Sequence, residues 1–118
     1  MSLESSLFAL LSPLVGGRVF PDVAPFDTAR PYIVWQQIGG QAPTFLENTV
    51  PSKRNATVQI SAWADTRMDA NSTSLAIESA LTLATTVQAR ALAAHVAEHE
   101  PDLLRYGARQ DFSIWADR

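Results

Sequence analysis

The sequence contains no cysteine, which excludes disulfide bonds and metal sites built on thiolates. It also lacks an apolar run near the roughly 18–20 residues that a membrane-spanning helix needs. The apolar N-terminal stretch carries Glu4 and no early Lys or Arg, whereas a secretory signal begins with positive charge. We therefore expect a protein made in the cytoplasm that has no membrane partner.

Basic residues are few, with nine Lys and Arg against twelve Asp and Glu, for a formal charge of −3. The one basic pair, Lys53-Arg54, lies in a stretch rich in turn-forming residues. Domains that grip nucleic acid through its phosphates need a clustered basic surface. We therefore expect no sequence-specific binding of nucleic acid.

Glycine-rich phosphate loops and G-x-S-x-G nucleophile elbows are absent as well. The one chemical motif is His95-Val96-Ala97-Glu98-His99, which matches the H-x-x-E-H pattern of inverted zinc peptidases. On a helix the two histidines would share a face, but on a strand they would lie about 13 Å apart. Pro101 would end a helix directly after the motif, and a third ligand is missing. We expect no catalytic residue, cofactor or metal, and keep a small ligand- or metal-binding domain as an alternative.

A single domain over residues 1–118 is expected, since 47% hydrophobic residues suffice for one core. Leucines at helical spacing predict a first helix that stops near Leu11, before Pro13. Thr66 and Asp69 have the spacing of a capping box, which predicts a second helix over residues 67–84. The expected buried seam of that helix consists of Thr73, Ile77, Ala80 and Ala84, flanked by Leu81.

Strands are predicted at residues 32–38, 57–63 and 106–115, where β-branched and aromatic residues gather. Residues 88–98 are ambiguous, because their alanines favour a helix while Leu92, Ala94 and Val96 alternate as in a strand. The order of elements predicts an α+β fold. We expect an antiparallel sheet of about four strands with two α-helices packed on one face.

Residues 39–55 form the longest predicted loop, with Pro43 and Pro51 and no helical period. Loops of this length are uncommon in compact domains and are usually functional or disordered. We expect a mobile arm, and we place a candidate assembly surface on Gln41, Phe45, Glu47, Lys53, Arg54 and Trp63.

Trp63 joins this surface because it breaks the alternation of its strand and falls on the outer side. Like Trp35 and Trp115, it lies on a predicted strand. Tryptophans in these positions either fill the core or anchor an interface.

The segments occur in an order that resembles a known family. Gly17-Arg18-Val19-Phe20-Pro21, a proline-rich loop and Pro31-Tyr32-Ile33-Val34-Trp35-Gln36 are similar to the opening of the tail-completion, or terminator, proteins of siphovirus-type phages and prophages. Val58-Gln59-Ile60-Ser61-Ala62-Trp63 with the helix after it resembles the central part of that family, and Asp111-Phe112-Ser113-Ile114-Trp115 its closing strand. Residues 88–98 depart from the pattern.

The resemblance implies a structural protein rather than an enzyme. Such a subunit would form a hexameric ring on the head-proximal end of the tail tube, stop tube growth and join the tube to the neck. Its expected partners are further copies of itself, the tail-tube protein and the neck or head–tail connector protein. It would act in the cytoplasm of the bacterial host during assembly and then in the virion tail. A neck protein is the alternative within this class.

Overall fold

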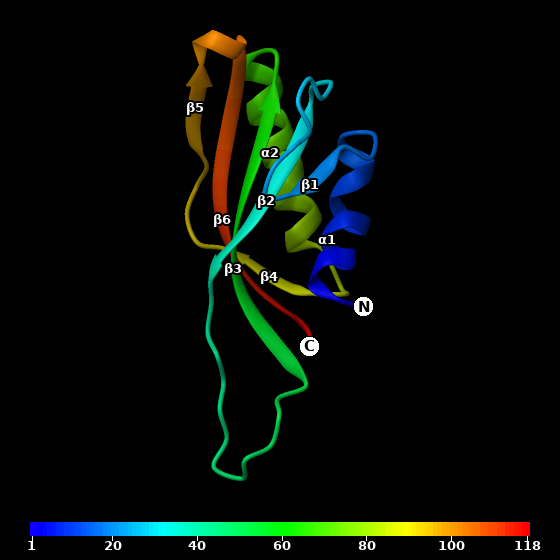
Figure 1. The fold of residues 1–118 in the computed structure, drawn as a ribbon, viewed down its shortest axis with the longest axis vertical. Coiled ribbons are helices and arrows are strands. Elements are labelled where there is room, and N and C mark those ends of the chain that lie inside the picture. The colour runs from blue at the N-terminus through cyan, green and yellow to red at the C-terminus, as the bar shows by residue number, and fades with distance from the viewer.

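The computed structural model describes all 118 residues. Two helices cover one face of a six-stranded sheet whose order is β1-β2-β3-β6-β4, with β5 also paired to β6 (Figure 1). The elements are α1 (Leu3–Leu11), β1 (Val19–Pro21), β2 (Tyr32–Gly39), β3 (Lys53–Ala64), α2 (Arg67–Thr82), β4 (Gln88–Ala91), β5 (Val96–Glu100) and β6 (Arg105–Asp117), with short 3-10 turns η1 (Ser12–Leu14) and η2 (Pro101–Leu103). Neither helix has the length and apolar character needed to cross a bilayer.

The predicted α+β class with two helices on one face is confirmed, but the expected four-stranded antiparallel sheet is wrong in two respects. First, β1 runs parallel to β2, because residues 22–31 carry the chain back before β2 begins. Second, the ambiguous stretch 88–98 holds β4 and the start of β5, which both pair with β6 along the same edge. The sheet is therefore mixed, and all its other pairs are antiparallel.

The core lies between the helices and the inner face of the sheet. Leu3, Leu7 and Leu11 of α1 are fully buried against side chains such as Ile60 and Phe112. Each such side chain contributes about 1.5–3 kcal/mol relative to an exposed one. Helix α1 ends at Leu11, as predicted, and at its start the Ser2 hydroxyl accepts a hydrogen bond from the Ser5 amide.

The predicted seam of α2 needs a correction. The buried residues are Ala70, Ser74, Ile77 and Leu81, whereas Thr73, Ala80 and Ala84 are only partly buried. The helix is turned so that its small residues Ala70 and Ser74 face inward at its first half. Ala70 packs there with Ala64 of β3 and Ala108 of β6, so small side chains line this end of the contact on both sides.

Candidate assembly site

The β2–β3 connection, residues 40–52, projects from the body as a long arm (Figure 1). With the arm the molecule measures 53 × 26 × 23 Å, so it is elongated. Residues 53–55 of the predicted loop belong instead to β3, where Lys53 pairs with Asp117 and Asn55 with Trp115 of β6. The arm is thus shorter at its C-terminal end than the sequence suggested.

The two legs of the arm do not pair with each other. Between residues 42 and 51 the one backbone hydrogen bond joins the Asn48 amide to the Phe45 carbonyl, at 3.2 Å. Three large apolar side chains are open to solvent, with Phe45 49%, Leu46 100% and Val50 72% exposed. An unpaired backbone with exposed apolar side chains is typical of a segment that a partner covers.

The root of the arm is held firmly. Gly40 has a φ of +141°, and a Cβ there would lie 2.6 Å from the Asn55 carbonyl oxygen, so only glycine fits. Asn55 is buried and accepts a hydrogen bond from the Gln41 amide at 2.9 Å. Its own amide group donates to the Ser113 hydroxyl and to the Ile114 carbonyl. The arm therefore leaves the body at a fixed point while its tip stays free of contacts.

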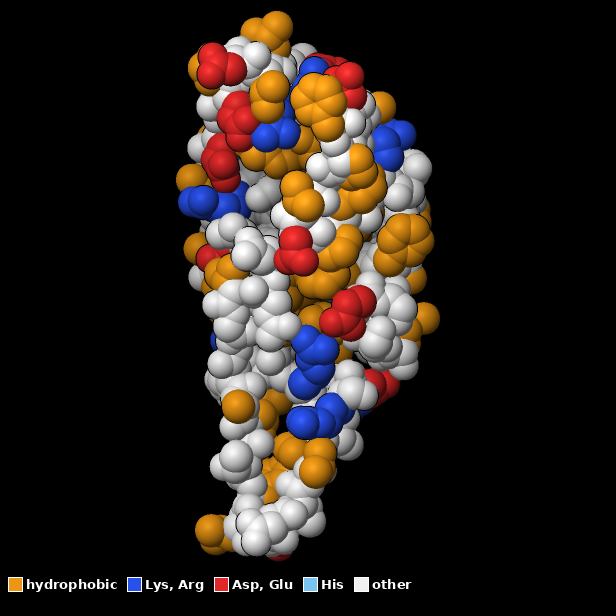
Figure 2. All heavy atoms as spheres, viewed as in Figure 1, with side chains coloured by type: hydrophobic (Ala, Val, Ile, Leu, Met, Phe, Trp, Pro, Cys, Tyr) orange, Lys and Arg blue, Asp and Glu red, His pale blue; other side chains and the backbone are white.

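Basic side chains gather where the arm meets the body, and acidic ones are more frequent toward the opposite end (Figure 2). Lys53 forms an ion pair with Asp117, which also lies 3.3 Å from the amino group of Met1. These hydrogen bonds, that of Lys53 foremost, hold the pKa of the Asp117 carboxyl below its ordinary value. Arg54 contacts Gln37 at 2.7 Å and Glu4 at 3.4 Å.

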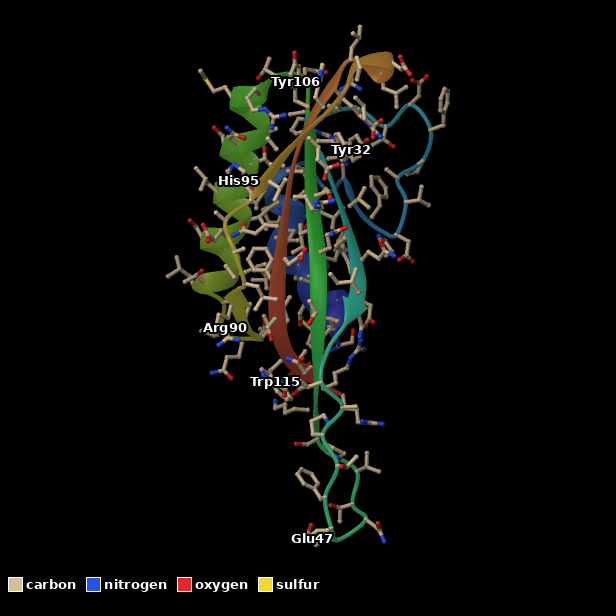
Figure 3. The ribbon with its side chains drawn as sticks, turned by 90° about the vertical axis from the view of Figure 1, so that its left-hand side faces the viewer. Tyr32, Glu47, Arg90, His95, Tyr106 and Trp115 are labelled. Carbon is tan, nitrogen blue, oxygen red and sulfur yellow. The ribbon has the colours of Figure 1, made fainter.

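Five of the six sequence-predicted surface residues therefore lie on the arm or at its root. Gln41, Phe45 and Glu47 belong to the arm itself, with Glu47 at its tip (Figure 3). Lys53 and Arg54 begin β3, at the root of the arm. The structure does not place Trp63 with them.

Trp63 lies on the outer face of the sheet, as its strand pattern predicted, but it is only 8% exposed. Its ring lies over Gly107, the residue opposite it on β6, where a Cβ would come within 2.7 Å of the ring. The Arg105 guanidinium covers the ring at 4.1 Å from its centroid. Trp63 is therefore buried by its own chain, whereas Trp35 fills the core and Trp115 is half-buried on the outer face.

Sequence reasoning missed a cleft of about 870 Å³ on this outer face, which no helix covers (Figure 3). The β1–β2 connection forms one wall, with Phe26 91% exposed, and β2 and β3 form the floor. The proline-rich sequence of this connection indicated an irregular loop, and isolated apolar residues such as Val23 and Phe26 gave no further signal. The lining comprises residues 22–30, Tyr32, Val34, Trp35, Gln36, Gln59, Ser61, Trp63, Asp65, Leu103 and Arg105.

The cleft contains polar groups without partners in the chain. Its two arginines are engaged, Arg30 with Asp65 at 2.6 Å and Arg105 with Glu100 and the Tyr32 hydroxyl. In contrast, the side chains of Gln36, Gln59 and Ser61 on the floor form no hydrogen bond. Asp22 and Asp27 on the wall form no ion pair.

The histidine motif does not form a helix. His95 precedes β5 and His99 lies within it, so the two are spaced along an extended chain. His99 stacks on Tyr106 with ring centroids 4.4 Å apart. No three His, Asp or Glu side chains converge closely enough to hold a metal ion.

Comparison with known proteins agrees with the resemblance seen in the sequence. A search of curated proteins found no significant match. The family model described as "Tail completion protein gp17" matches residues 6–117, a range that includes all six strands, α2 and most of α1. Because the match spans nearly the whole chain, this protein belongs to that phage tail-completion family.

Proposed function

We propose that this chain completes a phage tail by assembling into a ring on the head-proximal end of the tail tube. There the ring would stop tube growth and present a surface to the neck. The observation that carries the proposal is the arm, which exposes Phe45, Leu46 and Val50 on a backbone without internal pairing. An isolated subunit gains nothing from such a segment.

Assembly explains why the arm exists. Ordering an extended segment costs about 1–2 kcal/mol per residue in backbone entropy, which partner contacts must offset. A ring arises when one surface of a subunit binds a different surface of the next and the rotation closes. We assign the arm residues Gln41, Phe45 and Glu47 and the root residues Lys53 and Arg54 to one of these two surfaces.

The test is light scattering coupled to size-exclusion chromatography, on the protein alone and then with its cognate tail-tube protein. A ring, or a stable complex that halts tube polymerisation, is the expected result. A monomer that remains indifferent to the tube protein would contradict the proposal and favour a neck protein. A variant in which a short Gly-Ser linker replaces residues 42–51 serves as the control, because it should stay folded yet fail to assemble.

A further inference from the structure

We infer that the arm of one subunit lies in the outer-face cleft of the next. The inference rests on the proposed ring and identifies the two surfaces that meet in it. The arm and the cleft are distinct in position. Glu47 marks the tip of the arm and Tyr32, on the cleft floor, lies near the other end of the molecule (Figure 3). A chain therefore cannot fill its own cleft, and a second copy is needed.

The arm has the chemistry of an occupant. Between residues 42 and 51 its legs are extended and offer backbone N–H and C=O groups that no other part of the chain uses. Its apolar side chains, of which Leu46 is fully exposed, need cover. A single charge, Glu47, lies among residues 41–52, so the arm can enter a partly apolar cleft at little cost in desolvation.

The cleft has the matching chemistry. Amide and hydroxyl side chains can both donate and accept, so the free Gln36, Gln59 and Ser61 can pair with an extended backbone. Phe26, exposed on the wall, offers an apolar surface to the side chains of the arm. Binding would thus satisfy polar groups on both sides and remove apolar surface from water.

Charges of opposite sign without ion pairs lie on the cleft wall and at the root of the arm. Asp22 and Asp27 on the cleft wall lack ion pairs, and so does Arg118, beside Lys53 and Arg54 at the root of the arm. Opposite charges on two surfaces guide association and fix its direction. The contact is head to tail, which is the kind that closes into rings.

Disulfide trapping tests the contact directly, since the natural chain has no cysteine. The variant Leu46→Cys with Ser61→Cys places one thiol on the arm and one on the cleft floor. Mixed with tail-tube protein and oxidised, it should give a ladder of covalent multimers. The matched control is Leu46→Cys with Ser72→Cys, whose second thiol lies on the exposed side of α2 and should give none.

A second variant tests the charges. Asp22→Asn with Asp27→Asn keeps side chains that tolerate the positive φ of both residues. It should raise the concentration for half-assembly about tenfold, the equivalent of about 1.4 kcal/mol. Asp102→Asn, outside the cleft, should leave that concentration unchanged.

The outcomes separate the inference from the proposed function. The inference would be overturned if a ring formed without cross-linking between the arm thiol and the cleft thiol and if the loss of both aspartates left assembly unchanged. The proposed ring would then still stand. A protein that forms no ring and does not respond to the tube would instead refute the proposed function. Cross-linking of the test pair but not the control pair would support both.

Discussion

At the scale of single residues, Gly107 allows Trp63 to be buried on a face of the sheet that no helix covers. The indole lies over the glycine, where even one methyl group would come within 2.7 Å of it. We predict that Gly107→Ala lowers the free energy of unfolding by about 1–3 kcal/mol, because the ring must shift from an already packed site. Urea unfolding followed by tryptophan fluorescence measures the loss.

The matched control for Gly107 is Asp111→Ala, on the same strand and the same face. Asp111 forms no ion pair, so its loss should change the free energy of unfolding by less than about 0.5 kcal/mol. Equal stability of the Gly107→Ala variant and the natural protein would show that the Trp63 ring is free to move.

The lowered pKa of Asp117 predicts that the stability of the fold depends on pH in the acid range. Its pKa is lowered from 3.8 chiefly by the hydrogen bond from Lys53, and then by that from the Met1 amino group. A carboxyl whose pKa is lower in the folded state stabilises the fold above its unfolded pKa, and this contribution disappears as the pH falls through the folded pKa. We expect Asp117→Asn to reduce the acid sensitivity of stability below pH 3.8. Because the group is exposed, the difference should be small and should shrink in high salt.

Thermal melts of the natural protein and of Asp117→Asn across the acid range measure this effect. Asp102→Asn is the control, since Asp102 has no ion pair in the chain. Identical acid profiles for Asp117→Asn and the natural protein in low salt would count against a role for the Lys53 contact.

At the scale of elements, Arg67 joins the start of α2 to the edge of the sheet. Its guanidinium donates to the Gly107 carbonyl of β6 at 2.6 Å and to the Glu98 carbonyl of β5, and it lies over the Tyr106 ring. An edge strand with open carbonyls invites pairing with other chains, and a side chain that caps one of them weakens that tendency. Arg67 therefore holds β5 against the rest of the fold and reduces its tendency to pair with other chains.

We predict that Arg67→Met loosens β5 without unfolding the core. Amide hydrogen exchange in residues 96–100 should rise several-fold, while exchange in β3 stays unchanged, because local opening needs few contacts to break. Met68→Ala, at an exposed neighbouring position, is the control. Unchanged exchange in β5 of the Arg67→Met variant would mean that pairing with β6 alone holds the strand.

The elements that the sequence predicted well are those with strong local signals. Leucine spacing predicted α1 and Pro13 predicted its end, while the Thr66 cap predicted the start of α2. Strands β4 and β5 could not be assigned clearly, because both are short, the stretch 88–98 is rich in alanine, and their stability comes from pairing with the distant β6. The parallel pairing of β1 with β2 likewise depends on the path of the connection between them, which no local sequence pattern predicts.

The candidate site likewise contains features that the sequence predicted and features that it did not. Prolines and the absence of a period indicated the arm, and alternation correctly put Trp63 on the outer face. Neither its burial nor the cleft could be predicted, because both depend on residues far away in the chain. Gly107 and Arg105 cover Trp63 from β6, and the connection after β1 builds the cleft wall.

At the scale of the whole molecule, the distribution of charge limits how tightly the protein can bind DNA. The chain carries −3, and the basic residues Lys53 and Arg54 at the arm root are engaged with acidic neighbours. We predict that the assembled protein binds duplex DNA only weakly at physiological salt, as would suit the proposed ring if DNA passes through it. Fluorescence anisotropy with a labelled duplex measures the binding constant. The logarithm of that constant should fall with the logarithm of the salt concentration by about 0.9 for each phosphate contacted.

Tight, salt-resistant binding of DNA would contradict that prediction and would indicate that the protein binds the phage genome. The variant Asp102→Asn, which should assemble normally, provides a comparison, because it removes a negative charge without adding a basic cluster. It should bind DNA no more tightly than the natural protein if clustered cations, rather than net charge, decide affinity.

The unpaired legs of the arm also make it a substrate for proteases, which need an extended backbone that can leave its surroundings. Chymotrypsin should cleave a free subunit first beside Phe45 and Leu46, where the chain is exposed and holds no strand pairing. In the proposed assembly a neighbour would cover these residues, and the bonds beside them would become inaccessible. A fall in the rate of this cleavage would therefore report assembly, and it can be measured on a gel without purifying the assembled particle.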